Sequence, residues 1–175
     1  MSDFLNSFLH RALLAFSIFS SLQTPVHAQT TPTAADMVEQ LKTPPPRTRG
    51  LRNLTIESAV PEAKPSLSLL IQFDFNSARV KPESQQALSN LAQALQSKEL
   101  VDSKFAVEGH TDAKGRADYN LKLSQQRADA VRAFLASNGV QDSRLAAVGK
   151  GATELANAAD PQAAENRRVR IVNLN

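Results

Sequence analysis

Two side chains of opposite charge, Asp112 and Arg127, are the residues whose types and spacing most clearly suggest chemistry. Arg127 lies in a stretch that repeats apolar residues at helical spacing, and at about 100° per residue it falls inside the apolar sector of that helix. A cation directed toward a core must reach back to water or meet an anion, because an unpaired buried charge costs several kcal/mol. Asp112, in the polar loop before the helix, is the nearest anion in the same stretch.

The spacing of this pair allows two interpretations, and at this point both stay open. In the first, Asp112 and Arg127 form a structural ion pair. In the second, they stand slightly apart and bind one ligand that carries both charges. The carboxylate would then bind an ammonium group, and the guanidinium would bind a carboxylate through two hydrogen bonds. The free centre of an amino acid is such a ligand.

A helix predicted over residues 119–138 positions Arg127. Its apolar sector consists of Leu121, Leu123, Ala128, Val131, Phe134 and Leu135, and its water-facing side of Lys122, Gln125, Asp129, Arg132 and Ala136. Asp118 suits the cap at the amino end of this helix. At the other end, Gly139 suits the left-handed conformation that stops a helix, with Val140 folding back on the last turn. The preceding loop is expected to turn at Gly115 with positive φ.

The remaining elements alternate strands and helices. Strands are predicted over residues 66–75, 104–109, 144–148 and 167–174, and a first helix over 82–97 with Pro82 at its first position. The element order is therefore β-α-β-α-β-β. This order predicts helices packed on one face of a mixed four-stranded sheet.

Three segments resemble the signature segments of the OmpA-like C-terminal domain family. They read FDFNSARVKPES, GHTDAKGRADYNLKLSQQRA and ENRRVRIV, and they occur in the family's order and spacing within residues 66–175. The family also includes the peptidoglycan-associated lipoprotein and the flagellar stator protein that grips the cell wall. Three linked motifs are far more specific than one short pattern. The family's α/β sandwich agrees with the predicted element order.

The resemblance implies non-covalent binding of peptidoglycan through the meso-diaminopimelate of its stem peptide. Asp112 and Arg127 match the family's two principal ligand-contacting positions, which favours the second interpretation of the pair. The supporting ligand-binding positions that the resemblance implies are Thr111, Asn120, Asp74 and Arg167. Asn120 would either offer its amide to a ligand carboxylate or cap the loop locally. Asp74 is expected on the ligand side, since its neighbours Phe73 and Phe75 would face inward.

The other polar residues of the domain do not indicate a further binding or catalytic site. Of the cations on the last strand, only Arg167 matches the family's binding position, and Arg168 and Arg170 are expected to be solvated. His110 is expected to hydrogen-bond within its loop. No metal-binding constellation, nucleophile elbow or oxyanion hole can be recognised, so the sequence predicts neither an enzyme nor a cofactor.

The chain is predicted to have three parts. Residues 1–28 resemble a secretory signal peptide cleaved after Ala28, with an uncleaved anchor as the alternative. Residues 29–65 form a basic linker rich in Pro, Thr and Ala, and residues 66–175 form the OmpA-like domain. Within the linker, the run AADMVEQLK predicts a short helix, which is either a frayed linker helix or a docking segment for a partner. The run LRNLTIE predicts an edge strand over residues 51–57.

These features predict an exported protein. The absence of cysteine excludes a disulfide framework, a thiol nucleophile and a lipid-modified cysteine. No segment after the signal peptide is long and apolar enough for a transmembrane helix. The expected location is the periplasm of a Gram-negative bacterium, in association with the outer membrane if another molecule holds the protein there. Nucleic acid is not an expected partner.

Three functions can be compared on this basis. The first is a tether that attaches a component of the cell envelope to peptidoglycan. The second is a protein adaptor in an envelope or secretion assembly, which would bind outer-membrane or assembly proteins through residues 29–65. The third is a periplasmic hydrolase, for which the sequence offers no catalytic group. The three matching segments favour the tether.

Overall fold

The structure is a computed structural model, and it describes residues 31–43 and 64–175. The predicted signal peptide and the predicted edge strand at 51–57 lie outside the described residues. The two described ranges belong to one compact unit. The elements are α1 (Ala34–Leu41), β1 (Ser66–Leu69), α2 (Pro82–Leu95), β2 (Phe105–His110), α3 (Ala117–Ser137), η1 (Asp142–Arg144), β3 (Leu145–Gly151), η2 (Ala164–Asn166) and β4 (Val169–Asn173).

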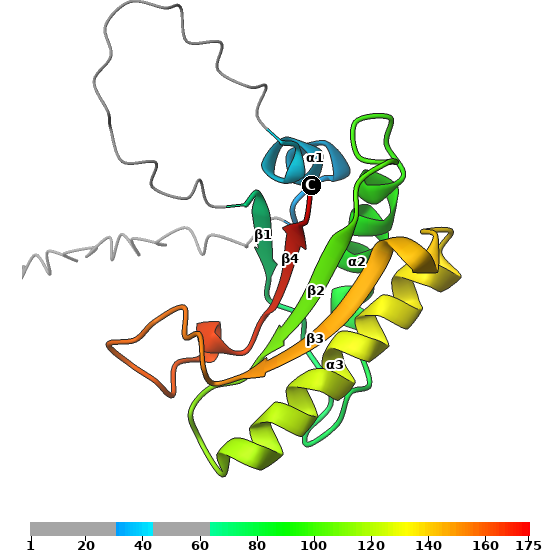
Figure 1. The fold of residues 1–175 in the computed structure, drawn as a ribbon. Helices are drawn as coiled ribbons and strands as arrows, with labels where there is room; N and C mark the ends of the chain where they lie inside the picture. Colours follow the sequence, from blue (N-terminus) through cyan, green and yellow to red (C-terminus); the bar gives the residue numbers. More distant parts are fainter. Residues whose placement is uncertain (1–30, 44–63) are drawn as a thin grey trace, which may run out of the picture. The chain divides into compact units, whose positions relative to one another are not determined.

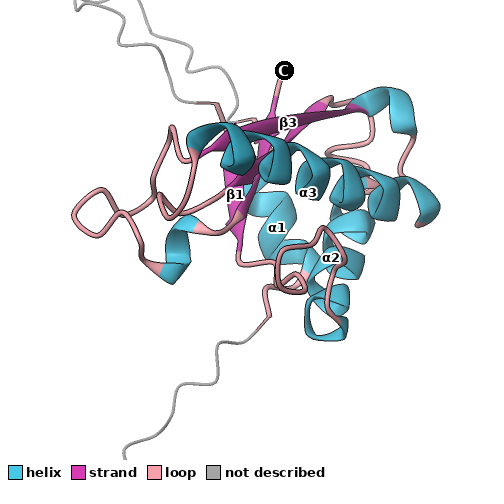
Figure 2. Cartoon of the chain, turned by 90° about the horizontal axis from the view of Figure 1, so that it is seen from below, coloured by secondary structure: helices cyan, strands magenta, loops and turns pink. Residues whose placement is uncertain are grey.

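The four strands form one mixed sheet in the order β1-β4-β2-β3 (Figure 1). Strands β2 and β3 are parallel, whereas β4 is antiparallel to both of its neighbours, β1 and β2. Helices α2 and α3 cover one face of this sheet (Figure 2). The α/β sandwich with a mixed four-stranded sheet is therefore confirmed, and so is the element order from β1 to β4.

The core lies between the sheet and the helices. Alternate residues of the strands point toward the helices, as the twofold period of a strand requires. Its members include Leu67, Leu69, Val107, Val169 and Ile171 from the strands and Leu88, Leu91, Leu95, Val131 and Leu135 from the helices, all buried. Burying each such side chain contributes roughly 1.5–3 kcal/mol.

Two glycines bring α3 unusually close to the sheet. A Cβ atom at Gly109 of β2 would lie 2.2 Å from the carbonyl oxygen of Ser124, and one at Gly149 of β3 would lie 2.6 Å from the amide nitrogen of Gln125. Neither position could hold a larger residue without moving the helix. The close approach fixes the rotation of α3 over β2 and β3, and so determines where Arg127 points.

The close packing of α3 on Gly109 and Gly149 makes the predicted division of this helix into an apolar face and a water-facing side partly wrong. Ser124 is fully buried, and the Gln125 side chain accepts a hydrogen bond from the amide of Gly149 at 2.7 Å, although Gln125 was expected in water. Leu121, expected in the core, is 51% exposed. Simple apolar periodicity missed this rotation, since a helix that rests on glycines directs small and polar residues toward the sheet.

The ends of the elements also differ from the prediction in two places. Strand β1 ends at Leu69, six residues early, and only an isolated bridge between Phe73 and Val80 continues it. Asp118 is not the cap of α3, because Arg116 occupies the cap position and donates to the Asp118 carboxylate at 2.8 and 3.1 Å. The predicted glycine conformations are confirmed, with φ of 93° at Gly115 and 94° at Gly139.

Helix α1 packs against the domain. A capping box between Thr33 and Asp36 starts the helix, and the side chains of Met37 and Leu41 are fully buried in the core. The buried side-chain amide of Asn173, at the end of β4, donates to the carbonyl of Leu41 at 2.9 Å. The helix predicted within the linker therefore exists, but its apolar side belongs to the core of the folded unit.

Candidate functional site

Arg127 lies midway along α3, half-buried beside the turn that follows β1. Its Nε donates to the carbonyl oxygen of Ser77 at 3.1 Å, and its guanidinium carbon lies 4.8 Å from the centre of the Phe73 ring. Burial lowers the pKa of Arg127 below its ordinary value. Among the residues that the structure describes, no carboxylate forms an ion pair with it. The η nitrogens of Arg127 are therefore not used by a protein anion in this part of the chain.

Asp112 pairs with a different arginine. One oxygen of its carboxylate accepts a hydrogen bond from Arg167 Nη1 at 2.7 Å, and the other accepts from the amide of Lys114 at 3.2 Å. The Asp112 side chain is 14% exposed and that of Arg167 is 48% exposed. The structural ion pair between Asp112 and Arg127 is thus not formed. The two charges are held apart, each by its own partners.

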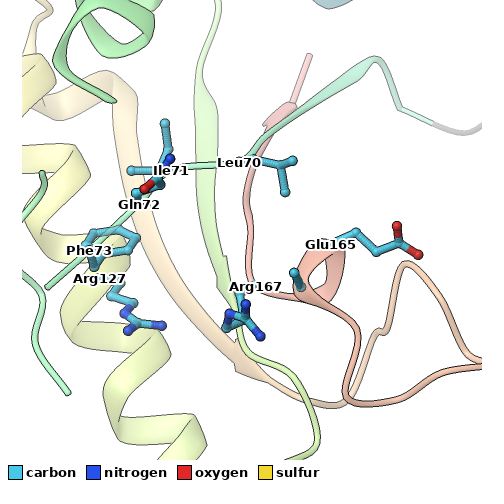
Figure 3. A pocket seen from close by; sticks show the side chains of 8 residues that line it. Leu70, Ile71, Gln72, Phe73, Arg127, Glu165 and Arg167 are labelled. Carbon is cyan, nitrogen blue, oxygen red and sulfur yellow. The ribbon is translucent and has the colours of Figure 1, made fainter. Parts of the chain in front are cut away.

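A cavity of about 370 Å³ opens beside Arg127 and Arg167, and the Asp112 side chain does not line it. It is lined by Leu70, Ile71, Gln72, Phe73, Arg127, Ala164, Glu165 and Arg167. Figure 3 shows Arg127 and Arg167 facing the same space from α3 and from the end of η2, with Phe73 beside Arg127. Two guanidinium groups beside an aliphatic wall suit a ligand that carries a carboxylate on an apolar chain.

Asn120 takes the loop-capping role that was one of its two alternatives. Its side-chain amide donates to the carbonyl oxygens of Asp112 at 3.3 Å and of Lys114 at 3.0 Å, and the residue is 5% exposed. These two bonds fix the loop that carries the Asp112 carboxylate. In this structure Asn120 contributes to the site by holding Asp112 in place, and it does not line the cavity.

Thr111 and Asp74, two other predicted ligand-binding residues, do not line the cavity. Thr111 is 3% exposed, and its amide donates to the carbonyl of Gly151 at 2.9 Å. Asp74 holds a turn, in which its carbonyl accepts from the amide of Ser77 at 3.2 Å. The expectation that both neighbours of Asp74 face inward is wrong for Phe75, which is completely exposed because this turn directs it away from the core.

Of the eight residues that line the cavity, only Arg127 and Arg167 were predicted as site residues, and Leu70 and Glu165 show why others were missed. Leu70 was expected inside a continuous strand, yet the strand ends before it and the side chain is 54% exposed at the cavity. Glu165 comes from η2, a short element inside what was predicted to be a loop. The only available signal was its place two residues before Arg167 in the ENRRVRIV segment.

The sheet face opposite the helices carries a second group of charges. Arg168 donates to the carbonyl of Glu154 at 3.1 Å, and Arg170 lies 3.6 Å from the Glu154 carboxylate and 3.8 Å from that of Glu108. Arg168 and Arg170 are partly buried, so the expectation that they are simply solvated is wrong. Side chains alternate along β4, so Arg168 and Arg170 point to the same face of the sheet as Glu108 and Glu154. Arg167 lies before the strand and points to the cavity instead.

His110 is buried beneath this charged group. It is 1% exposed and neither ring nitrogen has a hydrogen-bond partner among the described residues, so the expected bond within its loop is not formed. Burial, reinforced by the nearby positive charge of Arg168, lowers the pKa of His110 to about 4. The imidazole is therefore neutral near pH 7.

Features of two other classes of protein are absent from the described residues. Within residues 31–43 and 64–175, no group of three His, Cys, Asp or Glu side chains could hold a metal ion. No helix in the same ranges is long and apolar enough to cross a membrane.

The fold and the three segments can now be compared with known proteins. The sequence pattern of the OmpA family matches residues 72–169, which is more than half of the chain. The chain belongs to the OmpA family. The family match covers the cavity residues from Gln72 to Arg167, and it excludes α1.

Curated relatives are similar over part of their length. The outer membrane porin F of Pseudomonas fluorescens is 41% identical over 105 residues, which cover 59% of this chain and 32% of the porin. The peptidoglycan-associated lipoprotein of Brucella melitensis is 42% identical over 81 residues, which cover 46% of this chain and 47% of the lipoprotein. The chain thus matches between about a third and about half of these relatives.

Solved structures share the fold. The peptidoglycan-associated lipoprotein from Burkholderia pseudomallei is 35% identical, with a TM-score of 0.51 over 61% of this chain and 88% of that one. The cell wall anchor of the T6SS from Pseudomonas aeruginosa is 33% identical, with a TM-score of 0.51 over 63% and 81%. These names associate family members with the outer membrane, peptidoglycan and the cell wall, and none of these four relatives is named as an enzyme.

Proposed function

We propose that this chain binds peptidoglycan non-covalently through the diaminopimelate of a stem peptide, and so tethers an envelope component to the cell wall. The observation that carries the proposal is the half-buried guanidinium of Arg127, which faces the cavity and has no carboxylate partner among residues 31–43 and 64–175. Diaminopimelate ends in a free amino-acid centre. Its carboxylate would bind Arg127, and its ammonium would bind Asp112 beside Arg167.

The family membership and the charge separation support this proposal together. A partly desolvated arginine without an anionic partner raises the free energy of the folded protein, and a ligand carboxylate would offset this cost. The cavity also provides an aliphatic surface, from Leu70 and Ile71, for the methylene groups between the two ends of diaminopimelate. We place the protein in the periplasm of a Gram-negative bacterium, where such a ligand is exposed, and we assign it binding without catalysis.

The adaptor alternative has less support. It expected the segment 34–57 to dock a partner, and within the described part of that segment the apolar side of α1 is the surface that could do so. That side is already occupied, since Met37 and Leu41 are buried in the chain's own core. A partner could therefore bind this helix through its apolar side only by displacing it from the domain.

The test is co-sedimentation of residues 29–175, which contain the whole compact unit, with purified peptidoglycan sacculi. Arg127→Ala and Asp112→Ala should remain in the supernatant, whereas the unaltered protein pellets. Arg132→Ala is the matched control, because Arg132 lies on the same helix and pairs with Asp142 away from the cavity. Unchanged pelleting of both folded site variants would contradict the proposed site, and release of muropeptides would contradict binding without catalysis.

A further inference from the structure

Two aromatic side chains of the domain are exposed to solvent. The aromatic residues that the structure describes are Phe73, Phe75, Phe105, Tyr119 and Phe134. Phe105 is buried, and Phe73 and Phe134 are partly buried. Phe75 is 100% exposed and Tyr119 is 44% exposed. A phenylalanine side chain that leaves its whole apolar surface in water contributes nothing to the core, and so needs another explanation.

Both exposed aromatics border the surroundings of Arg127. Phe75 is in the turn whose Ser77 carbonyl accepts the hydrogen bond from Arg127 Nε. Tyr119 is on the first turn of α3, two turns before Arg127. Both rings therefore belong to segments that adjoin Arg127, one in the turn after β1 and the other on α3 itself.

The outer side of Tyr119 borders an open hollow of about 650 Å³. Its other lining residues are Arg116, Asp118 and Lys122. Arg116 and Asp118 form a planar, doubly hydrogen-bonded pair at 2.8 and 3.1 Å, and both remain largely exposed. A ring that offers an apolar face, next to planar donors and acceptors, is the combination that a sugar requires. One face of a pyranose is covered by C–H groups, and its rim carries hydroxyl and amide groups.

We propose that Phe75 and Tyr119 form a second subsite that binds the N-acetylated sugar rings to which the stem peptide is attached. This inference rests on the proposed function. The occupant follows from continuity, because a stem peptide held at Arg127 brings its own glycan to the rim of the cavity. The sugar rings stack on the two aromatic faces, and the polar groups of the hollow bind their hydroxyl and acetamido groups.

The experiment compares two ligands, the free tripeptide L-Ala-γ-D-Glu-meso-diaminopimelate and the same tripeptide attached to its disaccharide. Calorimetric titration of residues 29–175 should show that the disaccharide raises the affinity about fivefold, which is about 1 kcal/mol. This gain should disappear in the Phe75→Ser, Tyr119→Ser double variant, while affinity for the free tripeptide stays within about twofold. Because the chain has one tyrosine and no tryptophan, its fluorescence reports Tyr119 alone, and only the disaccharide-bearing ligand should change it strongly.

The control is Val101→Ser, since Val101 is 46% exposed and precedes β2 at the end of the sheet away from Asp112. This variant should keep the full gain from the disaccharide. Equal affinities of the two ligands for the unaltered chain would overturn the subsite, as would a gain that persists in the double variant. If the free tripeptide itself did not bind, the proposed function would fail, and the subsite with it, so the two failures are distinguishable.

Discussion

The carboxylate of Asp112 is hydrogen-bonded to Arg167 at 2.7 Å and not to Arg127. Arg167 therefore satisfies the acid, and Arg127 faces the cavity with a carbonyl and an aromatic ring as its neighbours. A ligand that carries a carboxylate can bind Arg127 without first breaking a protein ion pair. This arrangement explains how a charged pocket can be both stable and ready to bind.

The first prediction concerns the carboxylate of diaminopimelate. A stem tripeptide that contains lysine in its place keeps the ammonium but lacks the carboxylate that Arg127 would bind. We expect this analogue to bind about 10- to 100-fold more weakly, which corresponds to the loss of a charged hydrogen-bonded contact. Calorimetric titration with the two tripeptides measures the difference, and equal affinities would contradict the assigned role of Arg127.

The second prediction concerns the geometry of Arg127. Arg127→Lys keeps the positive charge but cannot form two parallel hydrogen bonds with a carboxylate or the same contact with Phe73. We expect it to lose most of the preference for diaminopimelate over lysine while its melting temperature stays close to that of the unaltered protein. If the preference survived in this variant, charge alone would be enough and bidentate binding would be excluded.

The third prediction tests the contact of α3 with the sheet. Gly109→Ala would place a methyl group 2.2 Å from the carbonyl oxygen of Ser124, so the helix must shift. We expect a loss of about 2 kcal/mol or more in the free energy of unfolding, measured by urea denaturation. Ala146→Val is the control, because Ala146 is exposed on the neighbouring strand and should change stability by less than about 0.5 kcal/mol. Equal stability of both variants would show that the contact is not tight.

The fourth prediction is a pH dependence from His110. Its folded pKa of about 4 lies below the ordinary value of 6.5, so the unfolded chain binds more protons between these two values. Stability should therefore fall as pH decreases from about 6.5 to 4, by up to roughly 3 kcal/mol from this group.

His110 is the only histidine after residue 28, so a proton NMR titration of residues 29–175 follows it without ambiguity. His110→Leu should flatten the acid side of the stability curve. A measured pKa near 6.5, or an unchanged acid slope in the variant, would contradict the burial of a neutral imidazole.

The fifth prediction concerns α1. Leu41→Ala removes a fully buried side chain and should lower the free energy of unfolding by about 2–4 kcal/mol. Glu39→Ala, on the exposed side of the same helix, should have little effect. Similar stabilities for the two variants, measured by urea denaturation, would mean that the helix does not pack as described.

Periodicity and linked motifs were sufficient to predict the sheet and the two long helices, α2 and α3. They could not predict the rotation of α3, because that depends on Gly109 and Gly149, two residues without side chains on strands far away in sequence. The partner of Asp112 was also beyond reach. Arg127 and Arg167 both match binding positions of the family. Only the three-dimensional course of η2 shows that the Asp112 carboxylate contacts Arg167. The exposure of Leu70 depends on where β1 ends, and no residue type marks that point.

Strand β4 connects the two functional ends of the domain. Arg167 precedes its first residue at the cavity, and the side-chain amide of Asn173, its last residue, donates to the carbonyl of Leu41 in α1. A pull on the chain at Thr31, with a wall fragment held at Arg127, would therefore act along the length of the sheet. Tension between Thr31 and a ligand bound at Arg127 would thus be transmitted through the sheet and through the two fully buried side chains of α1.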